Sequence, residues 1–378
     1  MGAPLHQTED GLDAFFVELD ALEAEIRDGL GEDDLAHLHR ISRWGRTCTA
    51  AGWATAWMGP NLLSASLLAM GRSARWSMVA HHSIHGGYDR LDEPRYHRKN
   101  FAKGWRRRLH DWMDIIPTTG WDREHNNLHH TRLGESADPD LVEENLGWLR
   151  DAEMPLPVRY AVLAVMASMW KWVYYAPSTM QEELIEQGQS EERRSLKDWR
   201  VWSPSHPDGR ALWLRSFLPY ATLQFALLPG LFLPLGPLAA ASAASNSLLA
   251  ELLTNLHTFL IITTNHAGED VWAFEDAPAS ARDFQLRQIL GSVNYRCGGD
   301  LNDFLHGWLN YQIEHHVWPD FSMLQYQRAQ PKLKTLCEKH RIPYIQESIW
   351  RRLKKTTDIM VGVTSMKRAH GSSLDMTA

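Results

Sequence analysis

The sequence predicts an all-α, integral membrane fold: a bundle of about four membrane helices with a cytoplasmic helical cap that carries a histidine-rich site. Two long uncharged stretches predict the membrane helices, because each is long enough to cross a bilayer. Polar regions of mixed charge, at about residues 90–205 and 267–378, predict the cap. Three histidine-rich segments beside the ends of the uncharged stretches predict where the site lies.

The composition excludes several classes of protein. The chain has 378 residues and a net charge of −7, so its charge does not favour a nucleic-acid partner. Its three cysteines lie far apart and form no C-x-x-C pair, which argues against a disulfide framework or a zinc ribbon and fits a reducing compartment. The 19 histidines and 17 tryptophans suit a metalloprotein at a membrane boundary.

The N-terminal region, residues 1–46, is expected to be an amphipathic cytoplasmic segment. It is acidic at its start and has no apolar core behind a basic start, so it does not resemble a signal peptide. Apolar residues recur in it at helical spacing, which predicts a packing helix: Phe15, Phe16, Leu19, Leu22 and Ile26.

The two uncharged stretches differ in length. Thr47–Gly71 has 25 residues between flanking arginines and is long enough to cross a bilayer once, although a buried helix of a soluble protein is an alternative interpretation. Ser216–Ala250 has 35 residues, which is too long for one crossing, and PGLFLPLGP at 229–237 interrupts it. This second stretch predicts a helical hairpin whose second helix continues to Thr264.

A weaker apolar stretch, Leu156–Ala176, contains Arg159 and Lys171 and is expected to lie at the membrane interface. If the histidine clusters share one site, an even number of crossings must separate them, and the hairpin supplies two. The excess of basic residues between the first two clusters predicts that this face is cytoplasmic. These residues are Arg98, Lys99, Lys103, Arg106, Arg107 and Arg108.

Three short segments carry the histidines. HHSIH at 81–85 and HNNLHH at 125–130 each hold two histidines four residues apart, a spacing that places both on one face of a helix. QIEHH at 312–316 holds an adjacent pair behind a glutamine. A single pair at this spacing is more often incidental than functional, but three clusters in one chain indicate metal binding.

The number and type of ligands indicate which metal is bound. Seven or more histidines exceed one tetrahedral zinc shell, so they predict two ions, and imidazole ligands suit redox-active iron. Neither an HExxH hydrolase motif nor a GxSxG motif is present in the sequence. Ligating imidazoles need hydrogen-bond acceptors behind them, and five acidic residues nearby are candidates for this role or are solvated loop charges: Asp89, Asp138, Asp140, Glu269 and Asp270.

The three segments, in this order and with a membrane hairpin between the second and third, closely resemble the membrane fatty acid desaturases. Gln312, where many relatives have histidine, resembles the front-end desaturases. DPDL at 138–141, LNDFLHGWLNYQIEHHVWPDFS at 301–322 and KLKTLCEKHRIPY at 332–344 are also similar to the family. The resemblance predicts a desaturase domain at 47–360 and a C-terminal tail at 361–378.

The resemblance implies a set of metal ligands. It implies a further histidine at the cytoplasmic end of the last membrane helix, for which His266 is preferred over His257, and it places Gln312 in a ligand-like position. His82 is extra to the motif. The implied ligands are His81, His85, His125, His129, His130, His266, Gln312, His315 and His316.

The resemblance also implies the activity: an O2-dependent oxidoreductase of lipid metabolism with two iron ions, which introduces a double bond into an acyl chain of a lipid or of acyl-CoA. No HPGG haem motif of a fused cytochrome b5 domain occurs in the sequence, so we expect electrons from a separate cytochrome b5 or ferredoxin. An acyl-chain hydroxylase or other lipid oxygenase on the same scaffold is the nearest alternative. A membrane metal transporter fits less well, because transporters place polar ligands within spanning helices.

Overall fold

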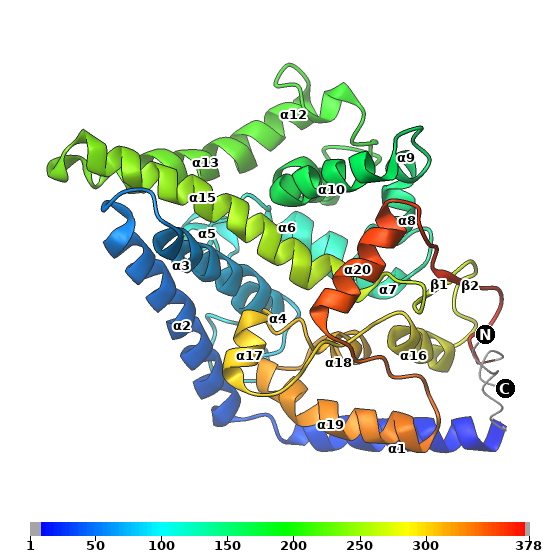
Figure 1. Cartoon of the computed structure of the whole chain (residues 1–378). Helices are drawn as coiled ribbons and strands as arrows, with labels where there is room; N and C mark the ends of the chain where they lie inside the picture. The colour runs from blue at the N-terminus through cyan, green and yellow to red at the C-terminus, as the bar shows by residue number, and fades with distance from the viewer. Residues whose placement is uncertain (1–8, 375–378) are drawn as a thin grey trace.

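The structure is a computed structural model that describes residues 9–374, and it is mostly helical with one pair of short strands (Figure 1). The longer helices are α1 (Glu9–Asp28), α2 (Glu32–Ala56), α3 (Leu62–Ser73), α5 (Gly104–Asp111), α10 (Leu156–Trp170), α11 (Ala176–Glu186), α15 (Pro237–Ile262), α16 (Ala281–Leu290), α19 (Met323–Lys339) and α20 (Ile349–Met360). The short helices are α4 (His81–Ile84), α6 (Thr118–Trp121), α7 (His130–Arg132), α8 (Val142–Asn145), α9 (Gly147–Arg150), α12 (Pro207–Ala211), α13 (Leu218–Ala221), α14 (Leu228–Gly230), α17 (Asp300–Leu305) and α18 (Gln312–Val317).

Several helices continue through π-helical or 3-10 turns. The π-helical segments are η1 (Ala74–Ala80), η2 (Asp122–His129), η3 (Lys171–Tyr175), η5 (Leu212–Phe217) and η6 (Thr222–Leu227). The 3-10 turns are η4 (Trp199–Val201), η7 (Leu233–Leu235) and η8 (Thr263–Asn265). Because π-helical turns commonly occur at functional sites, η1 and η2, which adjoin the first two histidine segments, are of particular interest.

The predicted hairpin is present. Its first limb runs over Pro207–Leu235 and its second over Pro237–Asn265, and both are long and apolar enough to cross a membrane. Gly236 makes the turn with a φ of 110°, a conformation that favours glycine. These are the two candidate membrane-crossing helices within residues 9–374.

The expectation of a single crossing at Thr47–Gly71 is wrong, because this stretch folds back on itself. Helix α2 ends at Ala56 and α3 begins at Leu62, with the side chain of Asn61 accepting a hydrogen bond from the backbone N–H of Ser64 (2.8 Å). The stretch is therefore the tip of a second helical hairpin. Helix α2 also runs through position 46, where the sequence predicted the end of the N-terminal segment.

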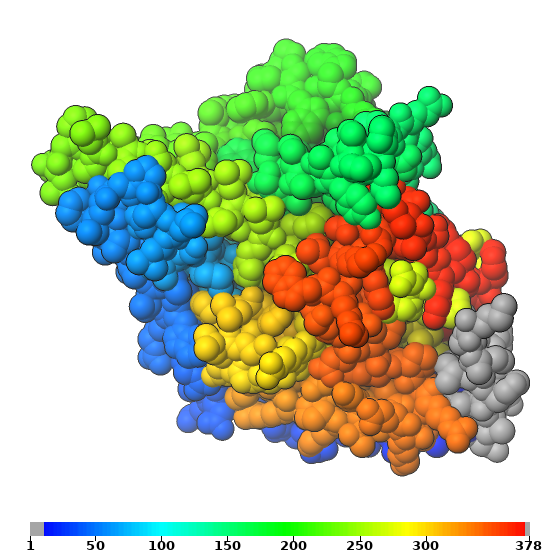
Figure 2. Space-filling model, viewed as in Figure 1, coloured from blue at the N-terminus to red at the C-terminus, as the bar shows by residue number. Residues whose placement is uncertain are grey.

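The tips of the two hairpins lie side by side at one corner of the molecule (Figures 1 and 2). The backbone N–H of Gly59 donates to Oγ of Ser242 (2.8 Å), and that of Asn61 donates to Oδ1 of Asn246 (2.8 Å). Small residues such as Ala69 and Ala250 are buried where α3 packs against α15. Polar side chains on a helix of one hairpin thus accept hydrogen bonds from backbone N–H groups in the turn of the other hairpin.

The cap packs around the far ends of the hairpins. Helix α1 lies along α19, and Arg27 forms a paired hydrogen bond with Asp320 (2.8 Å each). Strand β1 (Trp272–Phe274) pairs in parallel with β2 (Lys367–Ala369), which is the one departure from an all-α fold among the described residues. The segment expected to be a tail from residue 361 is therefore held against the cap through residue 374.

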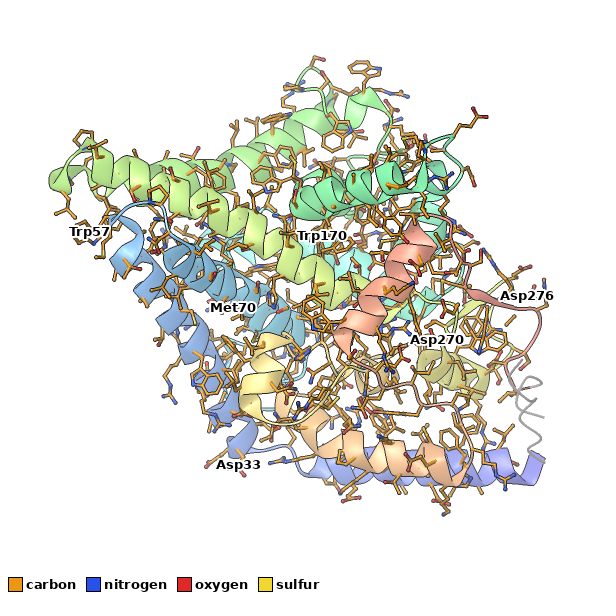
Figure 3. All side chains as sticks on the ribbon, in the orientation of Figure 1. Asp33, Trp57, Met70, Trp170, Asp270 and Asp276 are labelled. Carbon is orange, nitrogen blue, oxygen red and sulfur yellow. The ribbon has the colours of Figure 1, made fainter. Side chains whose placement is uncertain are left out.

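The third apolar stretch forms α10 and η3, which lie along α15. The indole N–H of Trp170 donates to the carbonyl of Asn255 (2.9 Å), and Figure 3 shows Trp170 between α10 and α15. Lys171 is fully buried and pairs with Asp114 (2.9 Å). This packing forms one wall of a cavity of about 800 Å³.

Candidate metal centre

The histidines come from several elements, and two of these elements continue helices of the hairpins. Helix α3, η1 and α4 form one continuous helix from Leu62 to Ile84, which delivers His81 and, directly after it, His85. Segment η2 carries His125 and His129. His130 begins α7, His266 follows η8, and α18 carries Gln312 and the last histidine pair.

Four buried histidines form the first group. The ligand nitrogens of His81, His85, His125 and His315 all lie within 4.8 Å of one another. Nε2 of His81 is 2.9 Å from Nε2 of His315 and 3.2 Å from Nε2 of His125. Two ligand nitrogens that each lie about 2.1 Å from one ion are roughly 3 Å apart, so this spacing fits a shared ion.

Three histidines form the second group: His129, His266 and His316, whose nitrogens also lie within 4.8 Å of one another. Nε2 of His316 is 3.2 Å from Nε2 of His266. The ring of His130 lies between the groups, with its centroid 4.6 Å from that of His85 and 4.3 Å from that of His316. Segments far apart in the sequence thus place seven imidazoles in two adjoining groups, with the imidazole of His130 between the groups.

The donor set fits bound metal. Nε2 of His85 and both ring nitrogens of His130 are buried and have no hydrogen-bond partner within residues 9–374. Burial lowers the pKa of His130 and of His316 well below the ordinary value, and neighbouring histidines lower it further. These imidazoles are therefore neutral at physiological pH, the form that binds metal.

Hydrogen bonds behind the imidazoles orient them toward the centre. Nδ1–H of His129 donates to Asp138 (2.8 Å). Burial lowers the pKa of His129, but the charge and hydrogen bond of Asp138, together with the charges of Asp140 and Glu124, outweigh burial and raise the pKa to about 9. Nδ1 of His315 faces the hydroxyl of Tyr326 (3.0 Å), and Nδ1 of His316 faces Oε1 of Gln288 (3.1 Å). Such partners fix the tautomer and leave Nε2 free for metal.

Sequence reasoning found only part of this outer layer. Asp138 was one of five acidic candidates, whereas Tyr326, Gln288 and the carbonyl of Gly291, which faces Nδ1 of His266 (3.1 Å), were missed. They lie 11 to 28 residues from the histidines they contact. Sequence spacing therefore contained no indication of them.

Two of the other acidic candidates bind basic residues instead. Asp89 pairs with Arg98, and Asp270 pairs with Arg352 (2.7 Å). The carboxylate of Asp140 lies 3.8 Å from His129, and with His125 these residues form a third cluster of potential ligands.

The remaining histidines of the motif regions lie outside the two groups. His257 contacts Oγ of Ser73 (3.0 Å) and the carbonyl of Leu305 (2.8 Å), so both of its nitrogens are occupied. His82 faces the carbonyl of Met78 (2.7 Å) through Nδ1. Gln312 is buried, and its Oε1 has no hydrogen-bond partner in the described part of the chain.

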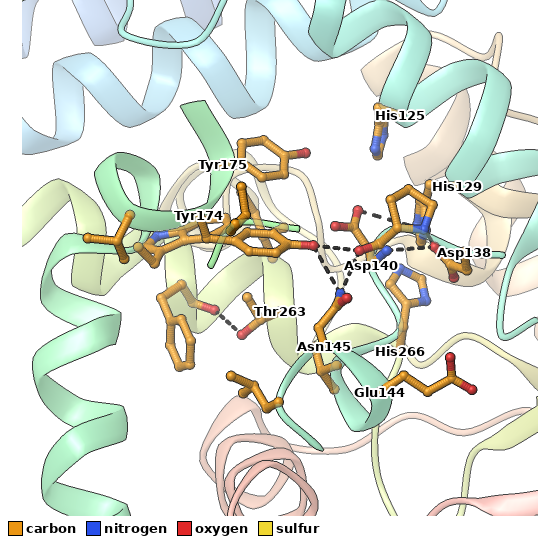
Figure 4. A pocket seen from close by; sticks show the side chains of 18 of the residues that line it. His125, His129, Asp138, Asp140, Glu144, Asn145, Tyr174, Tyr175, Thr263 and His266 are labelled. Carbon is orange, nitrogen blue, oxygen red and sulfur yellow. Dashed lines mark hydrogen bonds and ion pairs between the residues drawn. The ribbon is translucent and has the colours of Figure 1, made fainter. Parts of the chain in front are cut away.

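A cavity of about 800 Å³ adjoins both groups. Much of its lining is apolar, with side chains from α10, α15 and α20; they include Leu163, Met166, Trp170, Phe259, Ile262 and Met360. His125, His129 and His266 lie on one side of the cavity and Tyr174 and Tyr175 on the other (Figure 4). The volume and lining suit an apolar ligand placed against the metal centre.

The fold and the site together define a helical protein with a buried, histidine-rich metal centre that faces an apolar cavity. A sequence profile described as fatty acid desaturase matches residues 51–348. The chain therefore belongs to the fatty acid desaturase family. It is an oxidoreductase that introduces double bonds into acyl chains.

Individual relatives agree with this assignment. The chain is 22% identical to the NADPH-dependent stearoyl-CoA 9-desaturase of Mycobacterium tuberculosis over 377 residues, covering 93% of this chain and 81% of the relative. It is 23% identical to the sn-1 linoleoyl-lipid 6-desaturase of Arthrospira platensis over 307 residues, covering 80% and 77%. A Delta(8)-fatty-acid desaturase of Euglena gracilis is 31% identical over 101 residues, covering 25% and 22%.

Proposed function

We propose that this desaturase is an integral membrane enzyme with two iron ions, one bound by each histidine group. The observation that carries the proposal is the convergence of seven imidazoles on two adjoining positions beside the apolar cavity. The first ion would be held by His81, His85, His125 and His315, and the second by His129, His266 and His316, with His130 between them. Gln312 would contact iron directly or through water.

The protein itself positions the acyl chain and excludes water from the metal centre. Bound iron, together with O2 and electrons, supplies the oxidant that removes two hydrogens from adjacent unactivated methylenes. Because a methylene offers no hydrogen bond, the walls of the cavity select the reacting carbons by holding the chain at a fixed depth. Trp170 and Phe259 line the cavity. His81 from the first histidine group and His266 from the second group also line it.

The two hairpins support a membrane arrangement of four helical limbs. Both tips point the same way, and both pairs of limbs return to the cap, so the histidines that follow them lie on one side of the bilayer (Figure 1). The basic residues from Arg98 to Arg108 belong to this side, which favours a cytoplasmic catalytic face.

Electrons would come from a separate protein such as a cytochrome b5 or a ferredoxin. The Mycobacterium tuberculosis relative is NADPH-dependent, which supports NADPH as the ultimate source of the electrons. The substrate is an acyl chain carried by coenzyme A or by a lipid. The Mycobacterium tuberculosis and Arthrospira platensis relatives, which match most of this chain, are named for a coenzyme A substrate and a lipid substrate, respectively.

The proposal is tested by iron content and lipid products in the same membranes. We expect two irons per chain in the wild type, and we expect loss of iron and of turnover in His129→Ala. His370→Ala is the matched control, because His370 is exposed on the cap and should leave both unchanged. Full turnover by His129→Ala after iron loading would remove His129 from the proposed site.

Mass spectrometry separates the desaturase from its nearest alternative. Products two hydrogens lighter than the substrate are expected, whereas products one oxygen heavier would indicate hydroxylation. If vesicles that contain the wild type took up metal but formed no lipid product, the result would instead favour a transporter.

A further inference from the structure

A second cavity, of about 300 Å³, lies between the two hairpins and α5. Its lining has no residue in common with the cavity at the metal centre. Most of its walls are apolar or aromatic; they include Trp53, Leu68, Leu109, Trp112, Leu223 and Leu228. Three charged residues also line it: Arg72, Arg75 and Asp114.

Two of the three charges are already neutralised. Arg72 pairs with Glu251 (3.0 Å) and also donates to Gln224 (3.0 Å) and Ser247 (2.6 Å). Asp114 accepts from the buried Lys171 (2.9 Å). Each of these two residues therefore already has an oppositely charged partner.

Arg75 is different. It is half-buried, and within residues 9–374 its guanidinium makes no hydrogen bond, ion pair or cation–π contact. The guanidinium cannot lose its proton in a protein, so a charge held among apolar side chains is unfavourable until it meets an anion. Among the described residues, Arg75 is the one cation lining this cavity that forms no ion pair, although it lies within reach of the charge of Asp114.

The nearest acidic residue on the other side of Arg75 is also occupied. A small cavity of about 50 Å³ adjoins Arg75, and its lining includes Arg46 and Asp111. Asp111 pairs with Arg95 (3.0 Å) and Arg107 (2.8 Å). Arg46 is exposed, and within the described part of the chain its guanidinium donates only to the carbonyl of Ser42 (3.3 Å). Basic groups therefore outnumber acidic ones in the linings of both cavities.

The position of Arg75 suits a lipid headgroup. It follows the uncharged part of α3, which ends at Gly71, and in the membrane arrangement proposed above this change from uncharged to basic residues places Arg75 near the interface. Basic pockets between membrane helices at this level bind anionic headgroups. Leu227 and Leu231, on the neighbouring limb, are exposed and offer an apolar surface for acyl chains.

We propose that this cavity is a second lipid site, in which Arg75 binds the phosphate of an anionic phospholipid whose chains lie along the apolar walls. The lipid joins the two hairpins in a cavity that is separate from the one at the metal centre, and it is not the substrate. The proposal rests on the membrane location proposed above, but its test measures bound lipid and does not depend on desaturation.

The test uses the full chain purified from bilayers of dioleoyl phosphatidylglycerol and dioleoyl phosphatidylcholine, with retained lipid measured by mass spectrometry. Wild type should retain phosphatidylglycerol in preference to phosphatidylcholine. In Arg75→Gln this retention should fall about tenfold, because a charge-assisted contact to phosphate is lost. Arg75→Lys should recover part of it.

Arg106→Gln is the matched control, because Arg106 is exposed on α5 outside the cavity and loses the same charge. Equal retention by wild type and Arg75→Gln would overturn the proposal. So would loss of the lipid in Arg106→Gln to the same extent.

A second measurement covers the case in which Arg75→Gln does not fold. The melting temperature of wild type in nanodiscs should rise with the fraction of phosphatidylglycerol and should not rise with phosphatidylcholine. Inorganic phosphate added to phosphatidylcholine nanodiscs should have no effect. An equal rise with inorganic phosphate would make this a free-anion site and contradict a lipid site.

Discussion

The carboxylate of Asp138 accepts a hydrogen bond from Nδ1 of His129 over 2.8 Å, and both side chains are buried. We expect Asp138→Asn to keep the shape of the site but to weaken iron binding about 10- to 100-fold, because the imidazole loses the charge that orients it. Iron titration of the purified apoprotein measures this. Asp151→Asn, on the exposed surface, should bind iron as the wild type does. Unchanged affinity in Asp138→Asn would show that the contact does not support a ligand.

Gly120 allows the helix that leads into η2 to pack closely on α11. A Cβ at Gly120 would lie 1.8 Å from the carbonyl oxygen of Thr179. We expect Gly120→Ala to destabilise the protein by about 3 kcal/mol and to lower its iron content, because η2 carries His125. Thermal unfolding in detergent measures the loss. Gly147→Ala, where a Cβ meets nothing within 4 Å, should unfold as the wild type does.

Met166 lines the apolar part of the large cavity, whereas its neighbour Val165 is exposed. Met166→Trp should fill part of the path for the acyl chain, so we expect a preference for shorter substrates with iron content unchanged. Product analysis with a series of chain lengths tests this, with Val165→Trp as the control. The same chain-length profile in both variants would mean that the substrate does not occupy this part of the cavity.

Asp270 pairs with Arg352, which is fully buried, and with Lys355 (2.6 Å), at the side of α20 (Figure 3). Burial raises the pKa of Asp270, but the charges of Arg352 and Lys355 outweigh burial and hold the pKa below the ordinary value. A lowered folded-state pKa stabilises the protein above roughly pH 4, and this stabilisation is lost as the pH falls further.

We therefore expect the melting temperature of the wild type to fall between about pH 5 and pH 3 by more than that of Asp270→Asn. At pH 7 the variant should be less stable by about 2 kcal/mol, because the buried Arg352 loses one of two acidic partners and keeps Glu347 (3.5 Å). Thermal unfolding at several pH values gives both results. Parallel curves for the two proteins would contradict a role for this pair in acid stability.

Much of the fold and of the site followed from local patterns. The uncharged stretch at Ser216–Ala250 and its break at 229–237 predicted a hairpin, and the turn lies at Gly236. The four-residue spacing of His81 and His85 predicted that both lie on one face of a helix, and the structure places one ring nitrogen of each in the same group. The role of each histidine as a ligand stays a prediction.

Other features depend on contacts that a local pattern does not contain. The stretch Thr47–Gly71 has the length of one crossing, yet it turns after Ala56 and forms the tip of a hairpin. The side chains of Ser242 and Asn246 accept hydrogen bonds from backbone N–H groups in this turn. His37 lies among charged residues in the sequence, yet it is buried against Trp308, with an angle of 75° between the two ring planes. Both outcomes are decided by residues more than 180 positions away.

Anomalous diffraction at the iron absorption edge, from crystals of the iron-loaded enzyme, tests the proposed centre most directly. We predict two peaks, one among the nitrogens of His81, His85, His125 and His315 and the other among those of His129, His266 and His316. A single peak, or iron bound away from both groups, would contradict a di-iron site at this position.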